Sequence, residues 1–465
     1  MNGTHIERFN CINKTNIAEK KECVCNSDNV LTRPPSMEVA CYVYNMVFTT
    51  YGVDSKTLLS LGDKVSKGAF LPPSSNAYES ERFNYNKRYN IYPASIVQAN
   101  DTNDVCEALK FCRQHKLPFR IRSGKHSFEP SSIIQFGLVI DLHKMDKVLS
   151  FENDLITVQV GMTLGPFINY ISERGCCVPT GNCPTNGVGG FTLGGGLGLL
   201  SRRFGMTIDN VVELKMVNYK GKMLTVNKNE NSDLFFALRG AGGGNFGIVT
   251  EITYQTHKTS NFIFFELKYQ LSEKSVKLLN FWQHWADNLP NRVTSDVVIH
   301  NKEIPMYING IIVLDNKNPD KMLKLLEPLL ELKQHTEFSW KLMNTHEMYT
   351  HLAEGGYARP FFFKNRGNIF QEFMPKHTIE TIVEAALNIP KENMYSFIEL
   401  TSMGGKIGEV SPNETAFPHR GAKIWALYSS LWSNEVDNKI NIEWIDNFME
   451  KMEKYYPPKI GRAHV

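Results

Sequence analysis

Apolar and polar residues alternate along the chain with the period of a helix in some segments and of a strand in others. The order of these segments divides the chain into two parts. In the first part the pattern predicts strand, helix and strand at 92–97, 103–115 and 117–121, which is typical of a β-α-β unit. Further elements are predicted there: strands at 137–142, 155–160, 211–217, 223–226 and 248–254, and helices at 163–174 and 233–239. The turn at 220–222 predicts that the strands on either side of it form a hairpin.

The composition changes from about residue 262, where a second set of elements begins. Strands are predicted at 264–269, 293–299, 308–314, 394–400 and 424–431, with helices at 274–285, 319–332 and 379–387. This order predicts an α+β domain with an antiparallel sheet. We expect four segments: a leader with a helix at 37–50 that packs on the first domain (1–75), the first domain (76–257), the second domain (258–432) and a C-terminal segment (433–465).

Charge and composition favour a small-molecule partner. The chain has 465 residues and a net charge of +3 without a long block of one sign, which gives no support to nucleic-acid or membrane-surface binding. No apolar run is long enough to span a membrane, and no secretory signal is visible at the start. Asn-x-Thr triplets at Asn2, Asn13, Asn100 and Asn413 would fit secretion, so the localisation stays open.

Cysteine spacing does not predict a metal site. The chain has nine cysteines without paired metal-type spacing. Cys23-Val24-Cys25 alone is weak support for zinc, and we expect no bound metal.

The stretch 181–198 holds eight glycines and Cys183 within eighteen residues. Glycine loses more conformational freedom on folding than any other residue, so this density indicates backbone lying against a bulky ligand. His126 lies on another glycine-bearing loop. A lone histidine is more often structural, and a lone cysteine can be a buried free thiol, but together they suggest two attachment points for one planar cofactor.

A second glycine cluster matches the letters of the dinucleotide fingerprint. Gly242-x-Gly244-x-x-Gly247 has the required spacing, but that fingerprint follows a strand and opens a helix. Here a predicted helix precedes the cluster and a predicted strand follows it. The context therefore excludes a Rossmann-type site.

Five motifs stand in the order found in one flavoprotein family. They are Arg-Ser-Gly-Lys-His-Ser-Phe-Glu at 122–129, Gly-x-Cys-Pro-Thr-x-Gly-Val-Gly-Gly at 181–190, and the segments 205–211, 233–250 and 416–420. The chain resembles the berberine bridge enzyme-like flavoproteins of the vanillyl-alcohol oxidase superfamily over roughly 75–432. The resemblance implies an α+β fold in which a PCMH-type FAD-binding domain precedes an α+β substrate domain with an antiparallel sheet.

The resemblance also implies FAD held by two covalent bonds. His126 stands where the family's histidine bonds the flavin 8α-methyl carbon, and Cys183 where its cysteine bonds C6. The remaining residues with an implied cofactor-binding role are Arg122, Ser123, Gly124, Lys125, Ser127, Gly187, Val188, Gly189, Gly190, Gly194, Gly195, Gly196, Gly198, Gly247, Ile248 and Val249.

The implied reaction is oxidation of a C–OH or C–N group of a small molecule. In the family a hydride goes to flavin N5 while a base removes a proton, and oxygen or another acceptor reoxidises the flavin. The candidates for the base are Glu414, Glu409 and Tyr428; solvated carboxylates are the alternative for the two glutamates. His419 and Arg420 are expected to brace the same loop.

Four departures from the family pattern bear on the activity. Lys125 replaces a usual glycine, Phe128 a frequent tyrosine and Phe191 a frequent histidine. Asn186 stands where an apolar residue controls oxygen access in relatives, which leaves oxidase and dehydrogenase both open. The alternative hypothesis is a flavin-binding protein of this fold that has lost catalysis.

The last residues do not resemble the family's ending. The segment 460–465, Ile-Gly-Arg-Ala-His-Val, is what one reading frame of a common sequencing adapter would encode. We expect that the natural C-terminus is missing from this sequence, the alternative being a genuine polar tail.

Overall fold

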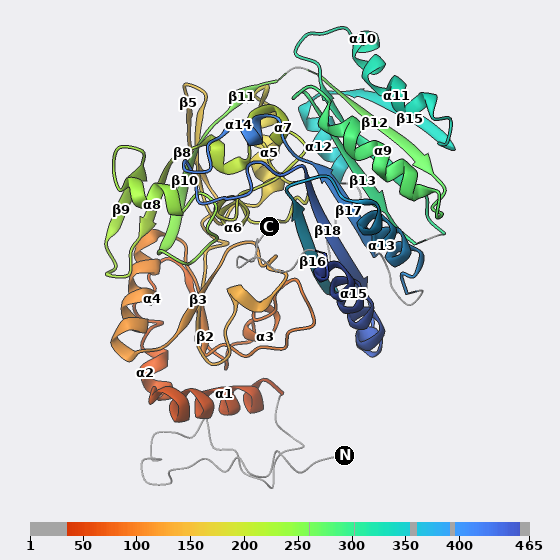
Figure 1. The fold of residues 1–465 in the computed structure, drawn as a ribbon. Coiled ribbons are helices and arrows are strands. Elements are labelled where there is room, and N and C mark those ends of the chain that lie inside the picture. Colours follow the sequence, from red (N-terminus) through yellow and green to blue (C-terminus); the bar gives the residue numbers. More distant parts are fainter. Residues whose placement is uncertain (1–34, 260, 302, 354–359, 391–395, 456–465) are drawn as a thin grey trace.

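The computed structural model describes residues 35–455 except 260, 302, 354–359 and 391–395 (Figure 1). It has the expected α+β architecture, with one part built from two larger sheets and a two-stranded one, β7 (Cys176–Cys177) with β11 (His257–Lys258), and a second part built on one large antiparallel sheet. The cysteines at 23 and 25 and the segment 460–465 lie outside the described residues.

The first sheet contains the predicted β-α-β unit in a modified form. Its order is β1-β2-β4-β3, formed by Ala69–Leu71, Ser95–Gln98, Leu138–Asp141 and Phe119–Arg122. The helix α4 (Thr102–His115) begins at the cap Asp101, whose side chain accepts from the Asp104 N–H, and ends at Lys116 in the left-handed region. The strands β2 and β3 both pair in parallel with β4, which lies between them. β4 is buried along its whole length, as a central parallel strand requires.

The second sheet is antiparallel and carries the predicted hairpin. Its order is β5-β6-β10-β8-β9, formed by Val148–Glu152, Leu155–Gln159, Ile248–Gln255, Val211–Val217 and Met223–Asn227. Val217 lies opposite Met223, which confirms the hairpin across the turn at 220–222. The sequence did not predict β5, because this edge strand is half exposed and lacks a clear apolar alternation.

The helix predicted at 37–50 is α1 (Pro35–Tyr51). Its Ala40, Val43 and Val47 are buried in the same hydrophobic core as Val105 and Leu109 of α4. This segment therefore packs on the first part of the chain, at the bottom of Figure 1.

The second part is a seven-stranded antiparallel sheet in the order β15-β12-β14-β13-β17-β18-β16. Its strands are β12 (Phe262–Tyr269), β13 (Val293–Ile299), β14 (Met306–Val313), β15 (Glu337–Met343), β16 (Phe362–Phe370), β17 (Phe397–Ser402) and β18 (Ile424–Trp432). The helices α9 (Ser275–Asp287), α13 (Lys376–Leu387) and α15 (Asn438–Glu453) cover one face of this sheet (Figure 1). The opposite face looks toward the first part of the chain.

Three features of the second part differ from the sequence prediction. The edge strands β15 and β16 were not predicted. The helix predicted at 319–332 is broken into short turns, Pro319–Leu323, Lys324–Leu326 and Glu327–Glu331, because Pro328 cannot donate within a continuous helix. The last helix begins at Asn438 and packs on β16 and β18, so 438–453 lies against the seven-stranded sheet.

Within the described segments, no helix combines the length and the apolar character that crossing a bilayer would need.

Candidate active site

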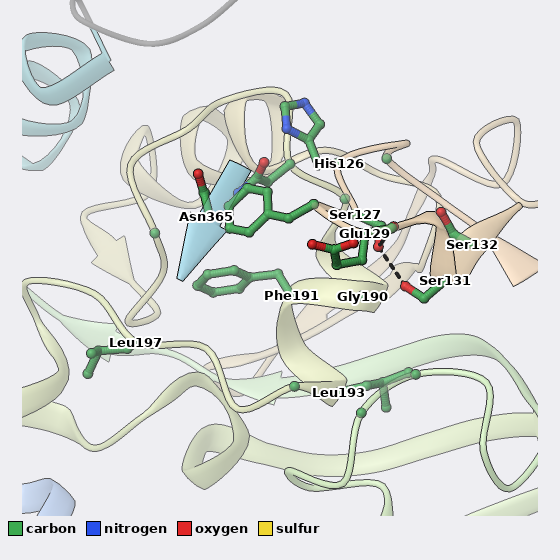
Figure 2. A pocket seen from close by; sticks show the side chains of 18 of the residues that line it. His126, Ser127, Glu129, Ser131, Ser132, Gly190, Phe191, Leu193, Leu197 and Asn365 are labelled. Atoms are coloured by element: carbon green, nitrogen blue, oxygen red, sulfur yellow. Dashed lines mark hydrogen bonds between the residues drawn. The ribbon is translucent and has the colours of Figure 1, made fainter. Parts of the chain in front are cut away.

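A cavity of about 2460 Å³ lies between the two parts of the chain. Its wall on the first part comes from the loops that carry His126 and Cys183, and its wall on the second part comes from the open face of the large sheet. Most of the expected cofactor residues border it: Ser123, Gly124, Lys125, His126, Ser127, Cys183, Gly187, Gly189, Gly190, Gly194, Gly198, Gly247, Ile248 and Val249. Figure 2 shows His126 and Phe191 from the first part together with Asn365 of β16.

The loops of His126 and Cys183 meet at two glycines. A Cβ on Gly124 would lie 2.2 Å from the Gly187 nitrogen, and a Cβ on Gly187 would lie 2.5 Å from the Gly124 nitrogen. The Ser123 hydroxyl beside them donates to the Val160 carbonyl at 2.7 Å. Because neither position has room for a side chain, the two backbones can pack directly and bring both loops to one cavity.

His126 is held by an aromatic neighbour. Its ring stacks on Tyr85 with centroids 4.2 Å apart and planes 25° apart. The Tyr85 N–H donates to the carbonyl of Lys125 at 2.9 Å, so Tyr85 is fixed to the same loop. Burial lowers the pKa of His126 to about 4, which leaves the imidazole neutral at physiological pH.

Cys183 lies close to the same tyrosine. Its Sγ is 3.4 Å from the Thr185 hydroxyl and is partly buried. Burial and, secondly, the Cys183 charge raise the pKa of Tyr85. Tyr85 therefore faces both expected attachment residues. The sequence analysis missed it, because nothing in the local pattern separates Tyr85 from the other aromatic residues near it.

Arg122 lies behind the cavity wall. It does not border the cavity but forms a buried ion pair with Asp141, with Nε and Nη2 at 2.9 and 2.5 Å from Oδ2. Burial would raise the pKa of Asp141, but the Arg122 charge, together with His143, lowers it to about 2. Arg122 thus joins the ends of β3 and β4, one residue before the cavity-lining loop.

Part of the expected glycine cradle also lies away from the cavity. Val188, Gly195 and Gly196 do not border the cavity, and Val188 is buried in the core. Gly196 has φ +74, and a Cβ there would lie 2.2 Å from the Thr207 hydroxyl. Gly190 is different, because no atom lies within 4 Å of the Cβ position and the backbone is open to the cavity. Some of these glycines therefore serve protein packing, and Gly190 leaves space for a ligand.

The three expected catalytic side chains do not reach the cavity. Glu409 is exposed and pairs with Lys406 at 2.8 Å. Glu414 is exposed and accepts from the Ser411 N–H at 3.1 Å. Tyr428 is fully buried and packs against Phe448 of α15, with ring centroids 4.6 Å apart. None of the three is among the residues that border the cavity, so their assignment as base stays a prediction without support from the geometry.

The pleat of the sheet explains the position of Tyr428. Side chains alternate between the two faces of a strand, and the neighbouring Leu427 lines the cavity. Strand pairing places Glu399 opposite Leu427 and opposite Val298, and places Asp296 opposite Thr401. Further residues of this cavity face are Phe397, Trp425, Asn365, Gly367 and Ile369.

Asp296 and Glu399 are the two carboxyl groups of this face. Asp296 is 6% exposed, and its Oδ1 has no hydrogen-bond partner in the described part of the chain. Burial raises the pKa of Asp296 well above its usual value, and the Glu399 charge raises it further. Burial raises the pKa of Glu399 to about 7. In the sequence, Asp296 and Glu399 could have been noticed because each is a single acidic residue within an apolar strand.

His419 and Arg420 are neighbours in the sequence, but one lines the cavity and the other supports the loop behind it. His419 borders the cavity, and its Nδ1 is 3.2 Å from the Gln371 amide nitrogen. Arg420 is buried and donates to both carboxylate oxygens of Asp209 at 2.8 and 2.7 Å. This ion pair connects the loop before β18 with the first part of the chain.

Among the residues with described positions, no group of three or more His, Cys, Asp or Glu side chains could hold a metal ion.

Comparison with known families and proteins identifies a flavin-binding segment. Residues 93–227 match the family model described as an FAD binding domain. The chain is 33% identical to the uncharacterised FAD-linked oxidoreductase YgaK of Bacillus subtilis, over 81% of this chain and 84% of that protein. It is 29% identical to berberine bridge enzyme-like 27 of Arabidopsis thaliana, over 80% of this chain and 73% of that protein.

A solved structure supports the fold. BBE-like 1 of Physcomitrella patens superposes with a TM-score of 0.77 at 24% identity, covering 86% of this chain and 88% of that chain. At this identity the match concerns the arrangement of the elements.

Proposed function

The chain belongs to the berberine bridge enzyme-like FAD-linked oxidoreductases, and we propose that it oxidises a C–OH or C–N group of a small molecule with FAD bound covalently at His126 and Cys183. One observation carries the proposal. In one cavity, His126 and Cys183 lie on the wall formed by the first part of the chain, and a half-buried carboxyl group, Glu399, lies on the wall formed by the second part. This arrangement supports Glu399 as the base, because a substrate that meets the cofactor in this cavity would lie beside it.

The residues of the cavity fit FAD. Its volume of about 2460 Å³ exceeds the range of roughly 300–1,000 Å³ that is usual for sites of small ligands, so it has space for a dinucleotide and a substrate. Gly190 leaves its backbone open to the cavity, with no atom within 4 Å of its Cβ position. The buried Oδ1 of Asn182, beside Cys183, has no partner within the described residues and can accept from a bound group.

The neutral state of His126 supports covalent attachment. A ring nitrogen can form a bond to carbon only through a free lone pair, which protonation would occupy. With a pKa of about 4, the imidazole keeps that lone pair at neutral pH. The stacked Tyr85 limits rotation of the ring, so the histidine is held ready in one orientation.

In the reaction, FAD supplies the acceptor for the hydride that leaves the substrate carbon. Glu399, as carboxylate, accepts the proton of the reacting hydroxyl or amine and leaves a C=O or C=N product. The side chains of Trp425 and Leu427 on the same face exclude water from the space around it. Bound FAD would pass the two electrons on to oxygen or another acceptor, and Asn186, which borders the cavity near Cys183, stands at the position that controls oxygen access in the family.

The test of the cofactor is mass spectrometry of the purified protein after acid precipitation. We expect a yellow pellet and flavin mass on two peptides, one with His126 and one with Cys183. The His126→Ala and Cys183→Ala variants should each keep flavin on the remaining peptide, and the double variant should release it. A wild-type pellet without flavin, with FAD in the supernatant, would refute covalent attachment.

The test of the activity is anaerobic bleaching of the bound flavin by candidate substrates. Carbohydrates, phenylpropanoid alcohols and alkaloid-like amines form the first panel. Bleaching by one class would identify the substrate class, and admission of oxygen or an artificial acceptor would separate oxidase from dehydrogenase. A flavin that remains oxidised with every class would favour the alternative of a protein that has lost catalysis.

A further inference from the structure

Two carboxyl side chains share one face of adjacent strands in the cavity wall. Asp296 lies opposite Thr401, and Glu399 is two residues away along the same strand, so the two acids are diagonal neighbours. Side chains in this relation are within reach of each other when they are long. Asp296 is nine-tenths buried, and both acids border the cavity.

No cation compensates this pair. Within the described residues neither Asp296 nor Glu399 takes part in an ion pair, and Oδ1 of Asp296 has no partner. Two adjacent carboxylates that are buried without a cation repel each other and lose hydration. The two groups are therefore not both ionised at the same time near neutral pH. A single proton held by the two carboxyl groups removes most of the free-energy cost of this repulsion and lost hydration.

We propose that Asp296 and Glu399 act as one acid–base unit that holds a single proton, in which Asp296 keeps the proton and Glu399 takes the proton of the substrate. This inference rests on the proposed oxidation. It adds Asp296 as a second catalytic residue, whose protonated carboxyl donates a hydrogen bond to the reacting oxygen or nitrogen.

An alcohol substrate loses one hydride and one proton. The C–H bond breaks and its electron pair leaves as hydride to the flavin, while the O–H proton moves to the Glu399 carboxylate and a C=O bond forms. Asp296 keeps its proton and stabilises the negative charge that develops on oxygen. Both carboxyls are then protonated, and Glu399 returns its proton to water before the next substrate enters.

The groups around Asp296 and Glu399 determine the pKa values of the two carboxyls. Burial, the Glu399 charge and the Thr401 hydroxyl act on Asp296, and burial acts on Glu399. Tyr307 and Glu266 face the pair from neighbouring strands, and the other titratable side chains that line the same cavity are Cys112, Arg113, Lys116, Arg120, Lys125, His126, Glu129, Cys183, Arg366, Glu372, His419, Glu453 and Tyr455. None of these is among the groups that shift the pKa of Asp296.

The first experiment is an infrared pH titration of the holoprotein, which needs no substrate. At about pH 8, one unit above the pKa of Glu399, the wild type should keep the carbonyl stretching band of one protonated carboxyl, and this band should shift in D2O. Asp296→Asn should abolish it. Glu399→Gln should make it disappear at a lower pH, because the repelling charge is gone.

A matched control is Glu409→Gln, an exposed carboxyl outside the cavity, which should leave the spectrum unchanged. Absence of the band in the wild type at this pH, or its persistence in Asp296→Asn, would overturn the proposal.

The second experiment follows the rate of flavin bleaching with pH. The wild-type rate should rise through about pH 7 as Glu399 ionises and fall at higher pH as Asp296 ionises. Asp296→Asn should keep the rise and lose the fall, because an amide donates a hydrogen bond at every pH. An alkaline fall that survives in Asp296→Asn would contradict the proposal. If no substrate bleaches the flavin, the proposed oxidation fails while the infrared result still decides the shared proton.

Discussion

Gly124 and Gly187 pack backbone against backbone, and this contact joins the loop of His126 to the loop of Cys183. Each glycine occupies the space where a Cβ of the other would lie, at 2.2 and 2.5 Å from the facing nitrogen. Neither has a positive φ, so space rather than backbone conformation requires glycine at both positions. The relative position of the two expected attachment residues therefore depends on this contact.

Gly124→Ala should lower stability and prevent flavin attachment at both residues. The added methyl group meets backbone atoms that cannot move aside, and such overpacking costs about 1–3 kcal/mol. The measurement is the thermal midpoint of the protein together with the flavin retained after acid precipitation. An unchanged midpoint with normal flavin content would show that the two loops adjust independently.

Gly190→Ala is the matched comparison. Its methyl group would meet no protein atom within 4 Å, and it lies in the short helix α6 (Val188–Leu193), where alanine is favoured over glycine by up to about 1 kcal/mol. We expect equal or higher stability of the protein without flavin, but lower flavin incorporation because the methyl group enters the cavity. Full incorporation in this variant would mean that the cofactor does not approach Gly190.

The stacking of Tyr85 on His126 predicts how flavin attachment depends on pH and on the aromatic ring. Burial sets the pKa of His126 at about 4, so the rate of attachment should stay level from neutral pH down to about pH 5 and fall below that as the imidazole becomes protonated. Tyr85→Ala should slow attachment at His126, whereas Tyr85→Phe keeps the ring and should leave it unchanged. Incorporation kinetics in refolded protein with added FAD measure both effects. A loss of rate already at pH 6.5 would indicate an ordinary solvated histidine.

Register along β17 and β18 predicts which side chain acts as base. Glu399→Gln should lower the rate of flavin bleaching by about 10²–10⁴-fold, because an amide cannot accept the proton. Tyr428→Phe should leave that rate unchanged, since Tyr428 lies on the opposite face of the sheet against Phe448. Stopped-flow bleaching of the two variants distinguishes them. A large loss in Tyr428→Phe with normal folding would restore the assignment made from the sequence.

The sequence predicted the fold and the cofactor loops because these depend on local signals. The strands Val211–Val217 and Val293–Ile299 lie where apolar residues, several of them β-branched, are frequent, and glycine density marked the loops beside the cavity. Residue type alone could not separate Gly190, which faces open space, from Gly196, which packs on Thr207. Whether a glycine faces open space or packs on another segment is decided only when segments far apart in the sequence come together in the fold.

The position of the candidate bases relative to the cavity could not be predicted for a related reason. Glu409 and Glu414 are near the Phe-Pro-His-Arg motif in the chain, but their loop turns to solvent. Glu399 and Asp296 lie on strands that are adjacent only in the folded sheet. The sequence shows an acidic residue within an apolar strand. It shows neither the partner strand nor the cavity that the residue faces.

The half-buried state of Glu399 predicts that Glu399→Gln stabilises the protein at alkaline pH. The pKa of this group rises from 4.5 to about 7 on folding, so the native state binds more protons than the unfolded chain between these values. Wild-type stability should therefore fall as pH rises from about 4.5 to about 7 and stay low above it. Glutamine cannot ionise, so the variant should exceed the wild type by about 1–3 kcal/mol at pH 8 and by little at pH 5. Denaturant unfolding at both pH values, with Glu409→Gln as the exposed control, measures the difference. A wild type that is the more stable protein at pH 8 would mean that the Glu399 carboxylate has a compensating partner in solution.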